Sequence, residues 1–479
     1  MPPAGRATPS PKPDYPLDRV ARGVIAVLTV ILVLLLVGGD RSQPQVRQFT
    51  WADRTLSAQD RAFILTFNRP MQQASVTDNL KITPPLPGRA SWAGRRMAYT
   101  LSQPVPYGQR FTLSLQGGRD QFGRQPRLMR PFQADFRSRD RVLIYLGTQG
   151  SEAGRLVLHN LTNPTHTVLT PPDLTILDFQ PFPQGDRILF SAQPATGDPL
   201  APPLYTVTTG LDYPPPVSLP GAPQLPAPRP GPAGRVDILL DDPTYQNLKF
   251  DLSADGQTIL VARASRRDPQ DTGLWRLTPQ GDLQRLNLPM GGDFLITPDG
   301  QSLVMAQGEG VALFPLQTGN EPLDFLPKFG QVLAFDPLGN EAALIKFNSD
   351  FTRSLYRVTN QGQEQELLRV QGSILSALFH PGRPVLYVLL AQARPERAYQ
   401  ELPTLGAINL ETRAFTPLLS FASPQLPHVS LAADGSALLF DQPGDTPDAP
   451  AGLWLYPLGE AMNPPQSLGL KGQRPQWLP

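Results

Sequence analysis

The 479-residue sequence contains no cysteine and only four histidines. The lack of cysteine excludes disulfide bonds, thiolate metal sites, cysteine nucleophiles and a lipid-modified N-terminal cysteine. The histidines are spread singly, without the i, i+4 spacing of common zinc sites, so no metal site is predicted. They are His159, His166, His380 and His428.

Linear catalytic motifs are also missing. The chain has no glycine-rich phosphate loop, no G-x-S-x-G nucleophile elbow, no H-E-x-x-H motif and no EF-hand loop. We therefore predict no catalytic residue, no cofactor and no enzymatic activity. His380 stands in a turn, where a structural role is expected, whereas His428 precedes an apolar strand and could face a channel mouth.

Proline is the residue in excess, at 57 of 479 positions, about 12% against a usual value of about 5%. Its fixed φ and missing N–H make it a poor residue inside helices and central strands. Many turns, loops and strand edges are therefore expected. The length predicts two or more domains, and a hydrophobic fraction of 40% is enough to fill their cores.

One long apolar run lies near the N-terminus. Gly23 to Gly39 contains no charged residue, and residues 24–37 read VIAVLTVILVLLLV. As a helix, these uncharged positions would rise about 25 Å, at the short end of what a bilayer core requires. We predict a transmembrane helix at 23–39 after a cytoplasmic proline-rich tail at 1–22. A cleaved secretory signal is the alternative.

Residues 45–138 alternate short apolar runs with turns. Five runs show the period-two alternation of half-buried strands: AFILTF (62–67), LKIT (80–83), RMAYTL (96–101), RFTLSL (110–115) and FQADF (132–136). This pattern is typical of an Ig-like β-sandwich. The segment resembles bacterial Ig-like domains of surface-layer and cell-envelope proteins through FNRPM (67–71), YGQRFTL (107–113) and D-x-x-G (120–123). The resemblance implies a spacer or adhesion module without chemistry.

Charge divides along the chain. Residues 41–141 contain 17 Lys and Arg against 6 Asp and Glu, whereas residues 142–479 contain 21 against 32, which gives net charges of +11 and −11. The basic segment is expected to contact anionic lipid head groups or an acidic polymer, or else the acidic part of its own chain. Nucleic acid is not an expected partner. The candidate contacts are Arg89, Arg95, Arg96, Arg124, Arg127 and Arg130.

From residue 174 onward one pattern repeats: an apolar strand, a turn with glycine and a second apolar strand. The turn glycines of six copies are Gly185, Gly256, Gly300, Gly339, Gly382 and Gly435. A period near 40 to 45 residues with β units indicates propeller blades. Residues 142–170 add three strands, and RPQWLP (474–479) adds one. We therefore predict a seven-bladed β-propeller at 140–479, closed by the C-terminal strand.

The turns TPDG (297–300) and FHPG (379–382) stand where TolB-like and WD40-like propellers carry S-P-D-G. The repeat region resembles those families in its fold. A proline-rich insertion at 213–234 contains nine prolines and favours polyproline II, as a stiff surface loop or as a recognition strand for a partner.

Together these features predict an all-β fold class with a transmembrane helix, an Ig-like sandwich and a propeller. The expected location is the bacterial inner membrane, single-pass, with the N-terminus inside and the later domains exported. The expected function is a cell-envelope binding or scaffold protein whose propeller binds an envelope protein or peptide. The alternative is a propeller enzyme or glycan-binding module acting on cell-wall polymer, because two carboxylates on different blades leave no spacing in the sequence.

Overall fold

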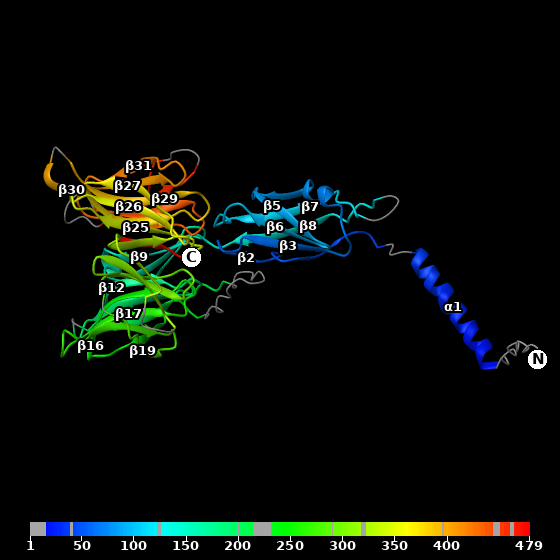
Figure 1. Ribbon diagram of the computed structural model, residues 1–479, viewed down its shortest axis with the longest axis horizontal. Helices are drawn as coiled ribbons and strands as arrows, with labels where there is room; N and C mark the ends of the chain where they lie inside the picture. The colour runs from blue at the N-terminus through cyan, green and yellow to red at the C-terminus, as the bar shows by residue number, and fades with distance from the viewer. Residues whose placement is uncertain are drawn as a thin grey trace, which may run out of the picture.

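One helix and two groups of β-sheets follow each other along the chain (Figure 1). Apart from two helices and one 3₁₀ turn, the regular structure of the described residues is strand, which confirms the predicted all-β class. The computed structural model describes residues 16–38, 42–121, 126–196, 198, 201–213, 231–289, 291–317, 322–394, 397–443, 451–459 and 464–479. Residues 1–15 of the predicted tail, most of the proline-rich insertion and Arg124 lie outside these ranges.

Residues 46–138 form two four-stranded sheets, which we call the sandwich. The sheet orders are β1-β3-β6-β5 and β2-β8-β7-β4, and every strand pair is antiparallel except β2 with β8. The bounds are Val46–Phe49 (β1), Thr55–Leu56 (β2), Ala62–Phe67 (β3), Leu80–Thr83 (β4), Gly88–Ala93 (β5), Arg96–Leu101 (β6), Arg110–Leu115 (β7) and Phe132–Ser138 (β8), with helix α2 at Gln73–Thr77.

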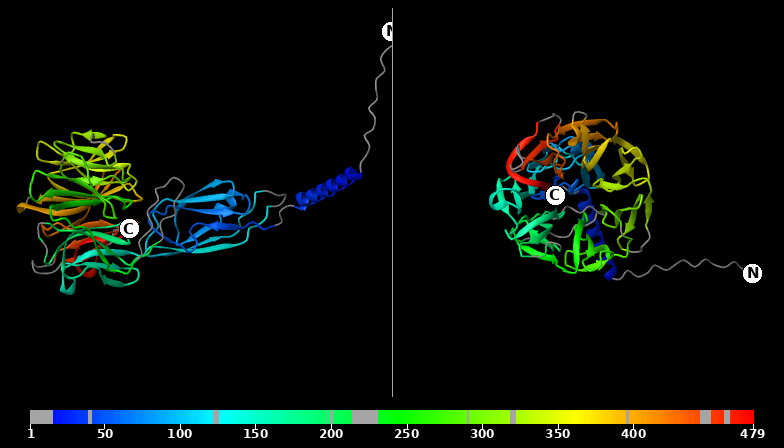
Figure 2. Two further views of the ribbon diagram at one scale, coloured as in Figure 1. Left: turned by 90° about the horizontal axis from the view of Figure 1, so that it is seen from below. Right: turned by 90° about the vertical axis from the view of Figure 1, so that its left-hand side faces the viewer.

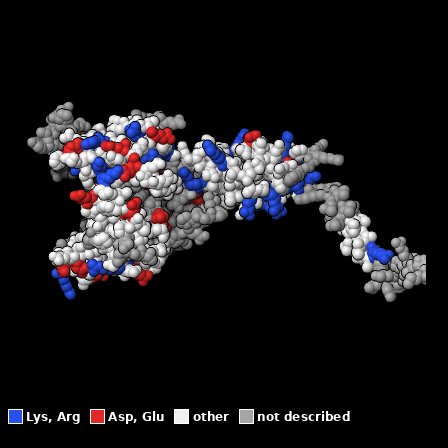
Figure 3. Space-filling view, viewed as in Figure 1, with Lys and Arg blue, Asp and Glu red and all other residues white. Residues whose placement is uncertain are grey.

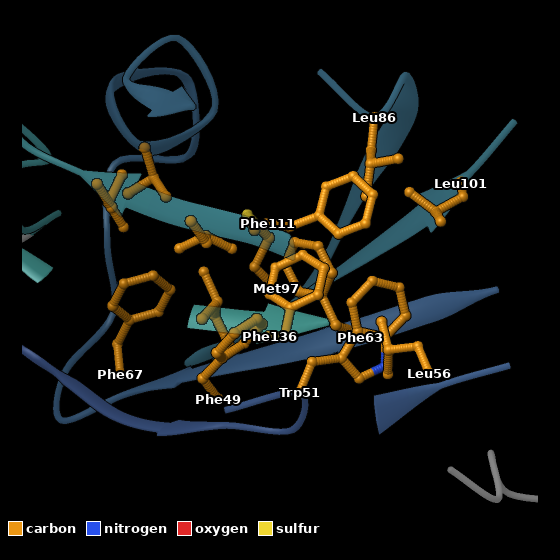
Figure 4. Close-up of a cluster of buried hydrophobic side chains, with 14 of the residues drawn as sticks. Phe49, Trp51, Leu56, Phe63, Phe67, Leu86, Met97, Leu101, Phe111 and Phe136 are labelled. Carbon is orange, nitrogen blue, oxygen red and sulfur yellow. The ribbon is translucent and has the colours of Figure 1, made fainter. Parts of the chain in front are cut away.

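Aromatic side chains fill the space between the two sheets (Figure 4). Alternation along β3 and β7 points Phe63, Phe67 and Phe111 to one side, where they are fully buried. Trp51 packs edge-on against Phe63, with ring centroids 5.1 Å apart, and Phe111 stacks on Phe136 at 5.3 Å. Each such side chain contributes about 1.5 to 3 kcal/mol through burial. The sandwich therefore has a core of its own.

Residues 142–477 form sheets arranged around a central axis as the blades of a β-propeller (Figure 2). Five sheets each contain four consecutive antiparallel strands. The first two are Leu174–Pro181 (β12), Arg187–Pro194 (β13), Leu204–Thr208 (β14) and Val236–Leu240 (β15), then Tyr245–Leu252 (β16), Ile259–Ser265 (β17), Thr272–Leu277 (β18) and Leu283–Arg285 (β19).

The other three sheets of this kind follow in the same order. They are Phe294–Ile296 (β20), Ser302–Gln307 (β21), Gly310–Pro315 (β22) and Asp324–Leu326 (β23), then Gln331–Phe335 (β24), Glu341–Phe347 (β25), Arg353–Thr359 (β26) and Glu364–Val370 (β27), then Gly372–Phe379 (β28), Val385–Arg394 (β29), Arg397–Asn409 (β30) and Phe415–Ser420 (β31). The first strands of neighbouring sheets contact each other, as β16 does with β20 and β24 with β28, so the first strand lies innermost.

A seven-stranded sheet joins the two ends of the ring, in the order β11-β10-β9-β35-β34-β33-β32. The long strand β35 pairs with β34 through its first half and with β9 through its second half. The ring therefore leaves no open edge between its first and last strands. The bounds are Val142–Gly147 (β9), Leu156–Asn160 (β10), Thr165–Val168 (β11), Val429–Leu431 (β32), Ala437–Gln442 (β33), Gly452–Pro457 (β34) and Gln466–Trp477 (β35), with a 3₁₀ turn at Gly150–Glu152.

The sandwich contacts one face of the propeller through turns that join first and second strands. The N–H of Tyr107 donates to Oδ2 of Asp434 at 2.8 Å, and the Arg61 guanidinium donates to the carbonyl of Pro381 at 3.3 Å. Both Tyr107 and Asp434 are buried, and burial raises the pKa of the Tyr107 phenol to about 12. The contact between the two parts is therefore partly buried and partly charged.

Arg139 is the most deeply buried cation of this contact, with 3% of its surface exposed. Its guanidinium donates to the main-chain oxygen of Pro479 at 2.8 Å and to that of Gln184 at 3.4 Å, and it lies 4.7 Å from the ring centre of Tyr213. Two main-chain acceptors and an aromatic face replace the water that this charge would otherwise hold.

Helix α1 spans Pro16–Gly38, over the predicted membrane segment. Among the residues that the structure describes, no helix combines the length and apolar character needed to cross a membrane. The prediction of a transmembrane helix at 23–39 is therefore wrong, and so is the inner-membrane location derived from it. The uncharged part of α1, from Gly23 to Gly38, rises about 24 Å, which is less than the thickness of about 30 Å of a bilayer core.

Candidate functional site at the channel mouth

The face of the ring opposite the sandwich is the one that Figure 2 shows face-on in its right-hand view. Strand β33 runs from the Asp434 turn, which contacts the sandwich, to Asp441 near the opposite face. Val429, the first residue of innermost strand β32, pairs with Phe440 beside it. The start of β32 and the end of β33 therefore meet at the inner rim of the ring, on the face away from the sandwich, and we call this rim the channel mouth.

Asp441 organises this end of the two strands. Its carboxylate accepts the N–H of His428 at 2.6 Å and the N–H of Arg474 at 2.7 Å, and Oδ2 lies 3.2 Å from Nδ1 of His428. The Asp441 side chain is buried at 8% exposure, whereas 56% of the His428 side chain is exposed. A buried carboxylate thus holds an imidazole that faces solvent.

Arg474 links this pair to the next sheet. Its guanidinium forms an ion pair with Asp178 and donates to the carbonyl of Leu177, both on β12, and it lies 5.5 Å from the ring centre of Phe179. Arg474 has φ of 54°, an uncommon conformation for a side-chain-bearing residue. The strain of such positions often marks a functional site. We call His428, Asp441, Arg474 and Asp178 the channel-mouth cluster.

Strand irregularities explain how the sequence forms this cluster. The pairing of β35 with β9 shifts between Gln473 and Gln476, and the pairing of β12 with β13 shifts between Ile176 and Asp178. A β-bulge turns a side chain out of the regular alternation. The two bulges bring the Arg474 and Asp178 side chains together.

The chemistry available to the cluster follows from the proton positions. When Nδ1–H of His428 donates to Asp441, Nε2 keeps its lone pair and can accept a hydrogen bond or a proton from a ligand in the channel mouth. The carboxylate fixes both the tautomer and the ring orientation, as in the histidine–carboxylate pairs of hydrolytic enzymes. The arrangement can therefore bind a donor group or serve as a general base.

Two apolar side chains are exposed on neighbouring innermost strands, one at the cluster and one on the next blade. Leu177 and Leu248 lie on the innermost strands β12 and β16, yet 43% and 54% of their surfaces are exposed. Both fall within β-bulges, so that they leave the packed interior of their sheets. The channel mouth therefore presents apolar and charged groups together.

His380 has a different role. It lies on the sandwich-facing side, where its Nδ1 accepts the N–H groups of Gly382 and Arg383, each at 3.0 Å. Burial, followed by the charge of Arg383, lowers the pKa of the imidazole to about 4. His380 therefore holds its turn as a neutral ring, in agreement with the structural role predicted from the sequence.

Five of the six predicted anion contacts lie within the described residues of the sandwich, and four of these occupy its end away from the propeller. The N–H of Phe67 donates to the carbonyl of Arg95 at 2.9 Å, and the N–H of Arg130 donates to that of Pro44 at 2.9 Å. Hairpin ends thus bring Arg95, Arg96, Arg127 and Arg130 to one end of the sandwich, all exposed. Arg89 lies opposite Thr100, towards the other end of β5.

Two further arginines at this end were missed from the sequence. Arg47 is the second residue of β1, and the Arg119 carbonyl accepts the N–H of Gln72 at 2.8 Å. Both side chains are exposed. Only the order of the strands could have found these two arginines. In antiparallel sheets, the start of one strand and the end of its neighbour lie at the same end of the sandwich. We call Arg47, Arg95, Arg96, Arg119, Arg127 and Arg130 the basic end.

No protein-family model matches the chain, and no curated protein matches it. Solved structures with a related arrangement include an oligogalacturonate lyase from Vibrio parahaemolyticus, with 10% identity over 64% of this chain and 84% of that one and a TM-score of 0.47. TolB from Acinetobacter baumannii has 11% identity over 84% and 83% of the two chains and a TM-score of 0.42. Hydrazine synthase from Kuenenia stuttgartiensis has 11% identity over 58% and 75%, at 0.39. These similarities carry no activity or partner over to this chain.

The prediction that the chain is not an enzyme is wrong as an exclusion. The physical reason is that a propeller gathers side chains from different blades, as it gathers His428 and Asp178 here, so that missing linear motifs do not exclude an active site.

Proposed function

We propose that this protein is a binding protein in which an Ig-like sandwich at 45–138 is docked on one face of a seven-bladed propeller at 140–479. The first half of β35 completes a four-stranded blade with β32 to β34, and its second half completes another with β9 to β11. Together with the five four-stranded sheets, these two support seven blades. Two facing sheets with an aromatic core support the Ig-like assignment. In this arrangement the sandwich covers one face and leaves the channel mouth to bind a protein or peptide.

The observation that carries the binding proposal is the pair of exposed leucines beside the channel-mouth cluster. A peptide that enters the mouth would bury Leu177 and Leu248, which gives up to about 25 cal/mol per Å² of apolar surface. His428 and the carboxylate of Asp178 would receive its polar groups. Mixed apolar and charged groups of this kind give both affinity and orientation in peptide sites.

The absence of cysteine provides the test. A single cysteine introduced as Leu248→Cys can carry a photo-crosslinker at the channel mouth, and Leu338→Cys is the matched control because Leu338 is 79% exposed in a sandwich-side turn. We expect a defined crosslinked product from position 248 and none from position 338, and we expect Leu177→Ser to reduce it. Equal products from both positions would contradict the proposal.

The histidine–carboxylate pair favours a second candidate, a propeller enzyme or glycan-binding module acting on cell-wall polymer. Nε2 of His428 would then accept a proton from the substrate or from water. If this is correct, His428→Gln lowers turnover of the polymer by about 100-fold or more, the usual contribution of a general base. His166→Gln is the control, because His166 lies on β11, at the opposite edge of the seven-stranded sheet from β32, where its imidazole contacts Glu152 of the 3₁₀ turn.

We also propose that the basic end contacts an anionic surface, as the sequence predicts for four of its residues, Arg95, Arg96, Arg127 and Arg130. The sandwich surface is rich in arginine, whereas acidic residues are spread over the propeller (Figure 3). Binding of the full chain to an acidic polymer or to anionic vesicles should weaken as salt rises, because the groups are exposed. The double variant Arg95→Gln, Arg96→Gln should bind at least about tenfold more weakly. Unchanged binding would refute this role.

A further inference from the structure

The outer face of the sheet β2-β8-β7-β4 carries an arginine pair that the basic end does not include. Arg110 on β7 and Arg137 on β8 are directly opposite in the antiparallel register, and both are exposed. Residues directly opposite share one face of the sheet, with Cβ atoms about 5 Å apart, and like charges placed in this way destabilise the sheet. The pair therefore needs a compensating partner.

The described part of the chain supplies only weak compensation. Nε of Arg137 donates to Oγ1 of Thr55 at 2.9 Å, a neutral acceptor, and neither Arg110 nor Arg137 forms an ion pair with a described carboxylate. The nearby Asp135 accepts the hydroxyl of Thr112 at 2.7 Å. Two guanidinium groups thus share one surface with most of their donors directed to solvent.

These side chains line an open hollow of about 470 Å³. Arg54 lines it as a third cation, and Asp53 and Asp135 line it as anions, so that the hollow has a net charge of +1. Phe111 and Phe136 also line the hollow, and their rings stack 5.3 Å apart on the core side of the same sheet. The pairing of β7 with β8 therefore sets the spacing of the arginine pair without a ligand.

From these observations we propose that Arg110 and Arg137 bind a phosphate group. Two guanidinium forks side by side present two sets of paired donors and two positive charges, whereas a carboxylate is planar and carries a single negative charge. The tetrahedral oxygens of phosphate accept from both forks at once. The anion places a negative charge between two like charges and removes their repulsion. The source is free phosphate or a phosphate-containing polymer.

Titration of the full chain with inorganic phosphate, followed by calorimetry at constant ionic strength in chloride buffer, tests the site. We expect saturable binding that weakens about tenfold or more in Arg110→Gln and in Arg137→Gln, the effect of losing charge-assisted hydrogen bonds. Arg89→Gln is the matched control, because Arg89 is exposed on the other sheet opposite Thr100. Equal losses in all three variants, or no binding beyond that of chloride, overturn the proposal.

A second measurement compares melting temperatures, first without phosphate and then with it. Because Arg110→Gln removes one of two opposed like charges, this variant should melt at a higher temperature than the unmodified chain in phosphate-free buffer, and phosphate should no longer raise its melting temperature. If Arg110→Gln melts at or below the temperature of the unmodified chain, the arginine pair is not frustrated and the reasoning fails.

Two further arms identify the ligand. Acetate should bind at least about tenfold more weakly than phosphate at the same ionic strength, and equal binding rules out the phosphate class. Short-chain polyphosphate that binds more tightly per phosphate group than inorganic phosphate indicates a polymer, whereas equal affinity per group indicates the free anion. Both of these last results support the site.

Discussion

Removal of the Asp434 carboxylate should weaken the contact between sandwich and propeller at the main-chain N–H of Tyr107. Oδ2 of Asp434 accepts the buried N–H of Tyr107 at 2.8 Å, and Oδ1 accepts the N–H of Ser436 within its own turn at 2.9 Å. Asp434→Ala removes both bonds. The buried Tyr107 N–H then loses a charged acceptor, at a cost of about 1.5 to 3 kcal/mol.

The matched control is Asp299→Ala. Asp299 holds the equivalent position of another blade, where Oδ1 accepts the N–H of Gln301 at 3.0 Å. Within the described chain, no hydrogen bond joins Asp299 to the sandwich. Both variants lose the bond inside the turn, and only Asp434→Ala loses the bond to the sandwich. The difference between the two variants therefore isolates the contact between the two parts.

Hydrogen exchange of the intact chain, measured by mass spectrometry on peptides that contain Tyr107, reports this difference. A loss of 1.5 to 3 kcal/mol corresponds to exchange about 10 to 150 times faster at this amide. We expect this acceleration in Asp434→Ala and none in Asp299→Ala. The same protection in both variants would refute the claim that Asp434 fastens the sandwich to the ring.

Three other perturbations follow from the fold. Gly435 has φ of 71°, and a Cβ added there would lie 2.6 Å from Cε1 of His380, whereas Gly362 has φ of 75° and open space around it. Gly435→Ala should therefore lower the free energy of unfolding by about 2 kcal/mol more than Gly362→Ala does. Equal melting temperatures of the two variants would contradict this. The pKa of His380 is lowered to about 4, against 6.5 in the unfolded chain, so only the unfolded state takes up a proton between these two pH values. Stability should therefore fall by up to about 3 kcal/mol as pH drops from 6.5 to 4. An imidazole that titrates near 6.5 in NMR spectra of the folded chain would disprove this. Deletion of residues 474–479 removes the buried Trp477 and Leu478 and part of the pairing of β35 with β9. The free energy of unfolding of the truncated chain should therefore be lower by several kcal/mol. A melting curve like that of the intact chain would show that β35 does not close the ring.

The strands of the sandwich were predictable because alternation of apolar residues has a direct structural meaning. AFILTF and RFTLSL place every second side chain on the buried face, and β3 and β7 have these limits. The helix near the N-terminus was also predicted, although its membrane role was not supported. Helix formation depends on local preferences, whereas the ability to span a bilayer depends on the full apolar length.

The candidate site could not be predicted in the same way. Asp178, Asp441 and Arg474 are separated by up to 296 residues, and β-bulges in β12 and β35 decide where their side chains point. No local sequence pattern predicts where a bulge forms or which residue lies opposite it. His428 could be placed before an inner strand from the sequence, but its buried carboxylate partner could not.

The sequence by itself determined the kinds of unit in this protein: a proline-rich, cysteine-free β chain with strand pairs that recur every 40 to 45 residues and charge divided between two segments. Those properties depend on residues close together in the chain. The tertiary structure alone decided which face of the propeller the sandwich covers, where the arginines gather and which side chains meet at the channel mouth. These depend on contacts across hundreds of residues, such as Tyr107 with Asp434, that no local pattern records.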